Sequence, residues 1–401
     1  MAIAVAENIF WVGVNDSETD LFEALWPLPH GISYNAYLIC DEKIALIDTV
    51  KKNFFEEFTA KIRPLLPEGR KVDYLIINHI EPDHSGALES LLRLYPDLCV
   101  VGNEKTFRLL QEFYRFPVKT RLIQDRETLS LGKRTLEFFI TPMVHWPETM
   151  MTYEKTSRIL FPGDVFGSYG ALPNGIFDDE VDPDLFTGEA RRYFANVLGK
   201  YCSPLQKSFA KIERLDIGIL APAHGPVYRK DLQRIRDLYG KWSRHETEKG
   251  AVVVYASMYE NTKKMAEAIA QGLTKSGIQE VRLYDISRTH LSFILSDILY
   301  FQGLILAACT YNTRLFPLME LLMTFLENDH FENHLLGLLG SHSWANTALP
   351  ALGDFAKKSM WKLIEPIIEA KGSPTKEILD QCGQLGKNMG QALQKTDERS
   401  S

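Results

Sequence analysis

The chain has 401 residues, of which 45% are hydrophobic and 24% are charged, and its formal net charge is −7. This length predicts two or three domains, and the composition is that of a globular protein with a sizeable core. The acidic charge argues against a nucleic-acid partner, which would need a basic surface. No apolar stretch reaches the length of a membrane span and the N-terminus has no basic leader, so we expect no membrane association and no signal peptide.

The chain contains five cysteines, Cys40, Cys99, Cys202, Cys309 and Cys382, which are scattered and form no Cys-x-x-Cys pair. This spacing excludes a rubredoxin-like or zinc-ribbon module within the sequence. It also fits a reducing compartment, so we expect a cytoplasmic protein.

The first 249 residues alternate short apolar runs with turns and amphipathic stretches. Residues 1–50 are typical of antiparallel strands, and the long Gly-, Pro- and Asp-rich segment 166–190 predicts a functional loop. The remaining pattern predicts strands at 72–77, 99–101, 134–142, 157–164 and 216–226 and helices at 54–66, 88–95, 104–114, 188–198 and 231–249.

The densest group of potential metal ligands is residues 78–86, NHIEPDHSG, between a predicted strand and a predicted helix. Ser85 is placed to cap that helix. The alternative interpretation is a charged surface turn that happens to precede a helix. His-x-Glu-x-Asp-His holds far more ligands than turn chemistry needs, so we favour a metal-binding loop.

The spacing within this loop suggests how two ions share it. In an extended stretch side chains alternate, so His79, Glu81 and Asp83 are expected to point one way and His84 another. This geometry suits two adjacent metal ions, the second of which is served by Asp83 and His84.

Three further candidate ligands, His145, Asp164 and His224, each follow a predicted strand. A lone histidine at such a position is more often structural than a ligand. Strand ends of a layered sheet converge in space, however, so residues far apart in sequence build one site there. Together with the 78–86 loop, these residues predict a dinuclear metal site.

These motifs and the strand order resemble the metallo-β-lactamase fold, an αββα sandwich whose usual members carry His-x-His-x-Asp-His and bind zinc. In this chain Glu81 replaces the second histidine, and a hard anionic oxygen favours iron. This variant resembles the flavodiiron proteins, also called A-type flavoproteins. The resemblance implies two irons per chain, one bound by His79, Glu81 and His145, the other by Asp83, His84 and His224, with Asp164 bridging.

At Gly250 the sequence changes character, so we place the domain boundary there, giving domains 1–249 and 250–401. A continuous apolar run, AVVVYAS, is followed by a hydroxyl-rich loop and the start of a helix, the arrangement that binds phosphate. This loop resembles the phosphate loop of flavodoxins, Thr/Ser-x-Tyr-x-x-Thr, and consists of Ser257, Met258, Tyr259, Glu260, Asn261 and Thr262.

Two later loops follow apolar strands and match the flavodoxin loops that enclose the isoalloxazine ring. The resemblance implies a doubly wound parallel sheet that binds FMN at its strand carboxyl ends. Tyr311 and Trp344 are candidates for ring contact, with burial in the core as the alternative. The two loops comprise Thr310, Tyr311, Asn312 and Thr313, and Ser341, His342, Ser343, Trp344 and Ala345. After Gln384 the chain is polar, and we expect it to fray.

By resemblance, the protein passes electrons from FMN to a diiron site that reduces O2 to water, NO to N2O, or both. It is expected to form a head-to-tail homodimer, or a dimer of dimers, served by a rubredoxin-like or other soluble electron donor. Tyr193 and Trp146 are expected to line the iron pocket. Relatives carry a histidine near that pocket where this chain has Glu23-Ala24-Leu25, so we expect His30 to influence the choice between O2 and NO.

Two alternatives remain open from the sequence. One is a zinc-dependent hydrolase with a regulatory flavodoxin domain, against which Glu81 stands. The other is a non-catalytic electron carrier, for which a complete set of metal ligands would serve no purpose.

Overall fold

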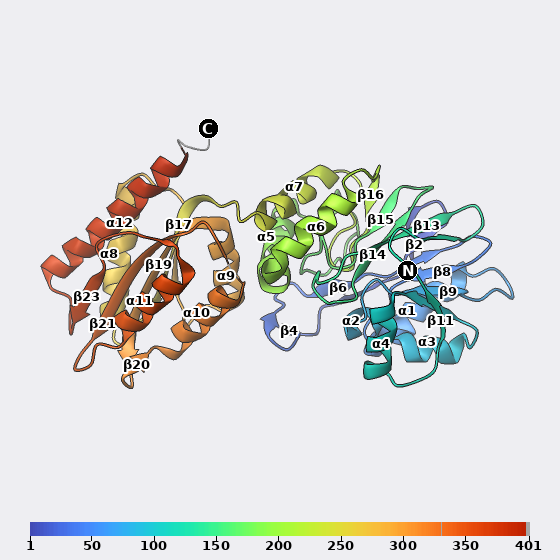
Figure 1. Cartoon of the computed structure of the whole chain (residues 1–401), viewed down its shortest axis with the longest axis horizontal. Coiled ribbons are helices and arrows are strands. Elements are labelled where there is room, and N and C mark those ends of the chain that lie inside the picture. The colour runs from blue at the N-terminus through green and yellow to red at the C-terminus, as the bar shows by residue number, and fades with distance from the viewer. Residues whose placement is uncertain (330, 398–401) are drawn as a thin grey trace. The chain divides into compact units, whose positions relative to one another are not determined.

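The computed structural model describes residues 1–329 and 331–397 and divides into two compact units, Met1–Gly240 and Lys241–Ser401 (Figure 1). The boundary expected from the sequence, between residues 249 and 250, falls inside β17 (Glu248–Ala256), which belongs to the second unit. In the part of the chain that the structure describes, no helix is both long and apolar enough to cross a membrane.

Two sheets form the centre of the first unit. The seven-stranded sheet has the order β1-β2-β7-β8-β9-β10-β11 and is antiparallel from β1 to β8 and parallel from β8 to β11. Its strands are β1 (Ile3–Ala6), β2 (Ile9–Trp11), β7 (Tyr37–Ile39), β8 (Ala45–Ile47), β9 (Tyr74–Ile76), β10 (Cys99–Gly102) and β11 (Lys119–Leu122). The five-stranded sheet comprises, in spatial order, β12 (Thr128–Ser130), β13 (Thr135–Ile140), β14 (Met150–Glu154), β15 (Ile159–Phe161) and β16 (Ile219–Leu220).

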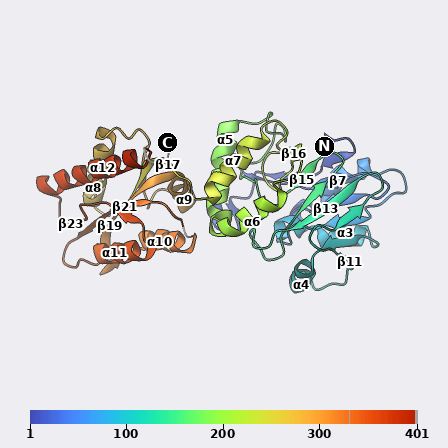
Figure 2. The same cartoon turned by 45° about the horizontal axis from the view of Figure 1, so that its top comes forward.

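The core of this unit lies between the two sheets, because alternate residues of each contribute to one buried cluster. Trp11, Ile39 and Ile47 come from the first sheet, and Phe138 and Phe161 come from the second. Helices pack around the sheets, as Figures 1 and 2 show, except for α2 (Pro82–Ser85), which lies in the loop that follows β9. The others are α1 (Phe55–Ile62), α3 (Leu88–Leu94), α4 (Glu104–Phe113), α5 (Pro183–Tyr193), α6 (Cys202–Ile212) and α7 (Leu232–Ser243).

Two small antiparallel pairs of strands complete the first unit. The sequence pattern did not predict them as separate strands. They are β3 (Val14–Asp16) with β6 (Ile32–Tyr34) and β4 (Leu21–Phe22) with β5 (Trp26–Pro27). The predicted loop 166–190 is partly helical, because α5 begins at Pro183 with Asp182 as its cap.

The second unit is a doubly wound sheet of the order β18-β17-β19-β21-β22, whose main strands are parallel. Buried residues of β17 and β19 pack against α8 and α12, while α9, α10 and α11 lie on the other face (Figure 1). Its further elements are α8 (Asn261–Lys275), β18 (Val281–Asp285), α9 (Leu291–Tyr300), β19 (Phe301–Tyr311), β20 (Arg314–Leu315), α10 (Pro317–Asp329), β21 (Leu335–His342), α11 (Ala348–Ser359), β22 (Lys362–Leu363), β23 (Ile368–Lys371) and α12 (Lys376–Asp397).

The expected fraying after Gln384 is wrong, because α12 continues to Asp397. Leu385, Met389 and Leu393 recur every four residues and are all buried against the sheet and α8. One apolar stripe therefore holds an otherwise polar helix in place.

Two glycines of α12 differ in what an added methyl group would meet. A Cβ at Gly386 would lie 2.1 Å from the backbone oxygen of Ile269 in α8, whereas a Cβ at Gly383 would meet nothing within 4 Å. We expect Gly386→Ala to lower the free energy of unfolding by about 1–3 kcal/mol through steric overlap. Gly383→Ala should raise it by up to about 1 kcal/mol, because alanine favours the helix. Denaturant unfolding of both variants checks the opposite signs.

Candidate metal centre

The loop after β9 places its four candidate ligands differently from the extended arrangement expected. Pro82 begins a short helix, so Asp83 and His84 lie on a helical turn rather than alternating along a strand. Ser85 does not cap the next helix; its hydroxyl donates a hydrogen bond of 2.5 Å to the carbonyl of Ile80 and closes the loop on itself. This turn directs both Asp83 and His84 into the site.

The structure brings the three distant candidates to the same place. His145 follows β13, Asp164 follows β15 and His224 follows β16. All three are buried and lie within ion-pair distance of residues of the 78–86 loop or of one another. The strand-end argument therefore predicted their proximity correctly, while their role as ligands stays a prediction.

Asp164 lies between two sets of donors. Its Oδ2 is 3.6 Å from His79 Nε2 and 3.4 Å from His145 Nε2, and its Oδ1 is 3.2 Å from His84 Nε2 and 3.4 Å from His224 Nε2. Donor atoms that bind one ion at about 2.1 Å and at right angles are about 3 Å apart. Each oxygen of this carboxylate is thus placed to serve a different ion.

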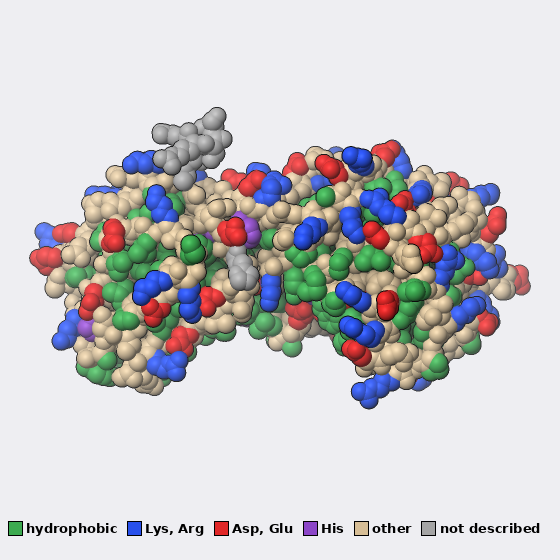
Figure 3. Space-filling model, in the orientation of Figure 1, with side chains coloured by type: hydrophobic (Ala, Val, Ile, Leu, Met, Phe, Trp, Pro, Cys, Tyr) green, Lys and Arg blue, Asp and Glu red, His purple; other side chains and the backbone are tan. Residues whose placement is uncertain are grey.

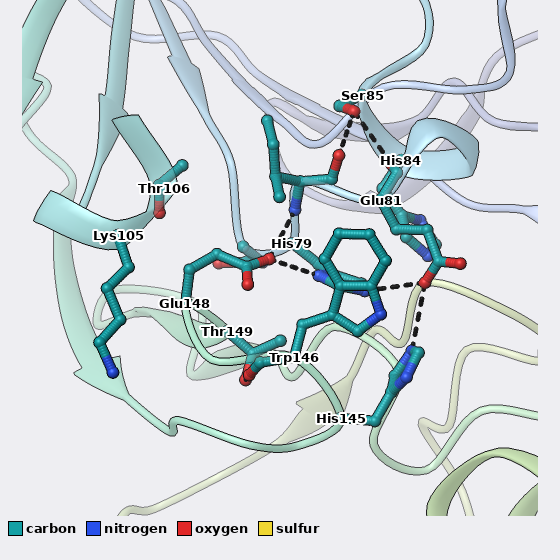
Figure 4. A network of polar contacts seen from close by, with 12 residues as sticks. His79, Glu81, His84, Ser85, Lys105, Thr106, His145, Trp146, Glu148 and Thr149 are labelled. Atoms are coloured by element: carbon teal, nitrogen blue, oxygen red, sulfur yellow. Dashed lines mark hydrogen bonds and ion pairs between the residues drawn. The ribbon is translucent and has the colours of Figure 1, made fainter. Parts of the chain in front are cut away.

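The remaining contacts complete each set. Glu81 Oε2 is 3.0 Å from His79 Nε2 and 3.2 Å from His145 Nε2, as Figure 4 shows. Asp83 Oδ2 is 3.4 Å from His84 Nε2 and 3.3 Å from His224 Nε2. Two groups of three, His79 with His145 and Asp164, and Asp83 with His84 and His224, each have the geometry to hold a metal ion.

Among the described residues, several buried polar atoms of this site have no hydrogen-bond partner. Both oxygens of Asp83 and of Asp164, and Nε2 of His84 and His224, are buried without a hydrogen-bond partner. Buried polar atoms are normally paired, and buried carboxylates demand a positive charge. A pair of divalent cations supplies that charge, so the donor set fits a dinuclear metal centre.

The protonation of the site without metal is consistent with this conclusion. Burial by itself lowers the pKa of His145, but the carboxylates of Asp164 and Glu81 outweigh it and raise the pKa to about 9. The same balance, with Asp164 and Asp83 as partners, raises the pKa of His224 to about 10. Without metal the imidazoles therefore carry protons, and metal ions would displace these protons on binding.

Sequence reasoning missed the residues that orient the ligands. Glu148, fully buried, accepts hydrogen bonds from His79 Nδ1 at 2.7 Å and from the backbone nitrogen of Ile80 at 3.0 Å (Figure 4). The backbone oxygen of Ser33 lies 2.8 Å from His224 Nδ1. Such partners fix the tautomer and direction of a ligating ring. The one sequence signal for Glu148 is its place in the loop that carries His145.

The pocket around these groups is aromatic. The ring of the buried Tyr193 lies 5.6 Å from that of His224, and the ring of Trp146 lies 5.1 Å from that of His79. His30 is exposed and belongs to none of the groups with metal-binding geometry in the described residues, whereas Glu23 does. Glu23 therefore lies beside Glu81 and His145, while the influence expected of His30 stays a prediction. Partial removal of its carboxyl from water, and then the negative charge of Glu81, raise the pKa of Glu23 to about 7.

The second unit holds a cavity of about 570 Å³ at the carboxyl ends of β17, β19 and β21. This volume suits a mononucleotide-sized ligand. Fourteen of the fifteen predicted loop residues line it, namely Ser257, Met258, Tyr259, Asn261, Thr262, Thr310, Tyr311, Asn312, Thr313, Ser341, His342, Ser343, Trp344 and Ala345. Glu260 does not, and the lining residues Cys309, Gly372 and Ser373 were not predicted.

The chemistry of this cavity matches a phosphate at one end and a flat ring at the other. The Ser257 hydroxyl is buried without a hydrogen-bond partner beside the N-terminus of α8, where backbone N–H groups favour an anion. At the rim, Trp344 is 84% exposed and Tyr259 is 83% exposed. Exposed aromatic faces beside a polar cradle fit the ring and the phosphate of FMN.

Comparison with known proteins agrees with the geometry. Residues 32–225 match the ODP family beta lactamase model and residues 253–386 match the flavodoxin model. The molecule is therefore a metallo-β-lactamase-like domain joined to a flavodoxin domain, and the predicted fold class is confirmed. The chain is 33% identical over 392 residues to a nitric oxide reductase of Moorella thermoacetica, covering 96% of this chain and 98% of the relative.

The similarity extends to further relatives. An anaerobic nitric oxide reductase flavorubredoxin of Escherichia coli is 31% identical over 395 residues, covering 97% of this chain and 82% of the relative. The flavodiiron protein from Giardia intestinalis superposes with a TM-score of 0.95 at 26% identity over 100% of this chain and 98% of that one. Rubredoxin oxygen:oxidoreductase from Desulfovibrio gigas gives 0.94 at 26% identity over 98% and 99%. The chain belongs to the flavodiiron protein family.

The contact between Glu148 and His79 generates a test of the metal centre. We expect Glu148→Gln to weaken binding of one of the two metal ions by about 10- to 100-fold, because His79 loses the carboxylate that orients it. Competition titration with a chelator measures this affinity. Glu104→Gln, at the exposed start of α4, is the matched control and should bind both ions as the unaltered protein does. Unchanged affinity in Glu148→Gln would contradict the orienting role.

Proposed function

We propose that the protein is a flavodiiron oxidoreductase in which FMN passes electrons to a non-haem diiron site that reduces O2 to water, NO to N2O, or both. The observation that carries this proposal is the pair of donor sets that share Asp164, in a chain that also has an FMN-sized cavity. Relatives named nitric oxide reductase and rubredoxin oxygen:oxidoreductase support it.

Each metal ion has its own protein ligands in this proposal. His79, Glu81 and His145 hold one iron, Asp83, His84 and His224 hold the other, and Asp164 bridges them. Glu81 supplies a hard oxygen where zinc enzymes of this fold carry a histidine, which favours iron. Glu148 and the Ser33 carbonyl keep the rings of His79 and His224 in the orientation that coordination needs.

When bound, FMN can deliver electrons one at a time and two ferrous ions can together reduce a diatomic oxidant. The chain contributes the surroundings of that chemistry. Tyr193, together with Phe22 and Tyr34, encloses His224 in aromatic rings and keeps water from that side of the site. In the second unit, the N-terminus of α8 and Ser257 bind the flavin phosphate, and Tyr311 and Trp344 contact its ring.

The two cofactor sites lie on separate compact units. We therefore propose a head-to-tail homodimer, alone or paired into a dimer of dimers, in which the FMN of one subunit serves the metal site of the other. We take a rubredoxin-like or other soluble carrier as the electron donor, which the relatives named flavorubredoxin and rubredoxin oxygen:oxidoreductase support. All five cysteines are free, which supports a reducing, cytoplasmic setting.

The metal and flavin content of protein purified without oxygen and without added metal tests the proposal. We expect two irons and one FMN per chain, and consumption of O2 or NO when a reduced rubredoxin is supplied. Two zincs, with no activity after reconstitution with iron, would instead indicate the zinc hydrolase. Bound FMN with no metal would indicate the electron carrier.

The substitution Glu81→His distinguishes the proposed iron-dependent oxidoreductase from a zinc-dependent hydrolase. We expect the variant to bind more zinc and to lose reductase activity, because a neutral imidazole replaces the anionic oxygen that favours iron. Elemental analysis and O2 and NO uptake measure the two effects. Retained iron and retained activity would show that Glu81 does not select the metal.

A further inference from the structure

We propose that Glu23 is an additional metal ligand, whose carboxylate binds the ion held by His79, Glu81 and His145. The inference rests on the proposed function, because it adds a residue to the proposed diiron site. Glu23 lies on the β4–β5 hairpin, far in sequence from the ligands named above, and its metal role is not assigned by the loop motif.

The geometry of the donor atoms supports this assignment. One ligand atom each of Glu23, Glu81 and His145 lie within 4.8 Å of one another. Ligands on opposite sides of an ion, at bond lengths of about 2.1 Å, are separated by about 4.2 Å. Glu81 and His145 are themselves only 3.2 Å apart. These separations are compatible with Glu23, Glu81 and His145 binding the same ion.

Glu23 lies beside the most exposed of the proposed metal ligands. The side chains of Glu81 and His145 are 14% and 9% exposed, whereas those of His79, His84, Asp164 and His224 are at most 2% exposed. Glu23 itself is exposed. Asp83, a ligand of the other ion, is 7% exposed, so the site is not closed on that side either. Glu23 lies beside Glu81 and His145, the two most exposed ligands, where a further donor can reach the ion.

The hairpin is fixed in place by the residue before Glu23. Phe22 is buried, and its ring centroid lies 5.6 Å from those of His224 and Tyr169 and 6.2 Å from that of Tyr193. A residue that follows such an anchor cannot lie far from the metal ligands. The position of Glu23 is thus set by packing in the pocket.

The turn that carries Glu23 has positive φ angles at two residues that disfavour them. Phe22 and Leu25 are joined by a backbone hydrogen bond of 3.0 Å, and the two residues between them, Glu23 and Ala24, have φ of 50° and 56°. Turns of this kind prefer Asn-Gly, and strained residues cluster at functional sites. This strained turn carries the carboxylate of Glu23, which lies beside Glu81 and His145.

The added ligand makes the two ions unequal. The ion near Glu23 gains a second carboxylate of its own, Glu23 with Glu81, while the other ion has Asp83 alone besides the shared Asp164. A further hard anionic oxygen strengthens the preference for iron at that ion. As a ligand, Glu23 would hold a position on the ion beside the exposed Glu81 and His145, where a substrate would compete with it.

The test compares Glu23→Gln with Asp20→Asn, an exposed carboxylate just before the same hairpin. Full-length protein carrying FMN is stripped of metal and titrated anaerobically with Fe²⁺ and, in parallel, with Co²⁺. We expect Glu23→Gln to bind one of the two ions at least about tenfold more weakly. Its Co²⁺ absorption should intensify because the coordination number falls, and one of its two Mössbauer doublets should shift. Asp20→Asn should match the unaltered protein.

Equal affinity and superimposable spectra for Glu23→Gln and the unaltered protein would overturn the assignment. Changes at both ions to the same extent would also overturn it, because they would indicate a general electrostatic effect. A result that rules out the proposed function differs from one that rules out Glu23 as a ligand. In that case the unaltered protein would bind two ions with Glu23 as a ligand, yet reduce neither O2 nor NO with a reduced donor.

Discussion

The buried carboxylate of Asp164 is the group on which the metal centre depends. Its two oxygens face different pairs of histidines, so it joins what would otherwise be two separate groups of ligands. Burial by itself would raise the pKa of Asp164, but the surrounding imidazoles hold it well below its usual value. A negative charge in this position is tolerated only because cations, whether protons on histidine or metal ions, always surround it.

The sandwich fold supplies this arrangement through the ends of its strands. Asp164 follows β15, and the 78–86 loop follows β9 of the opposite sheet, so the two sheets meet at the site. Asn78 links them, because its Oδ1 accepts a hydrogen bond of 2.7 Å from Thr152 and its backbone oxygen accepts one of 3.0 Å from Met150. The packing of the core therefore sets the distances between the donors, and the ligands need no flexible loop to converge.

The sequence allowed much of this to be predicted, since ligand identity and strand position are both local properties. The convergence of His79, His145, Asp164 and His224 followed from them, and the fold class came from the resemblance of the motifs to known families. Local patterns failed where the determining contact was distant. Glu148 joins the site through tertiary contacts that no spacing shows, and only the resemblance placed the segment of Glu23 near the pocket. Pro82 is a different case, because a proline that favours the first position of a helix is a local signal for the helical turn found there. The polar tail was misjudged because Leu385, Met389 and Leu393 matter only when α8 is present to cover them.

The ligands of the metal site differ in depth, and this difference bears on which of them a molecule from solvent can approach. His84, Asp164 and His224 lie in a fully enclosed region lined by Phe22, Tyr34 and Tyr193, whereas Glu81 and His145 retain contact with solvent. Glu81 and His145 are therefore the ligands that a small molecule from solvent can approach most readily. Residues on the side of Glu81 and His145, rather than those of the buried side, are the ones that can vary access and donor set without disturbing the core. Glu23 lies there, and its hairpin contributes no strand to either large sheet, so the chain can change this ligand while the sandwich that holds the others stays intact.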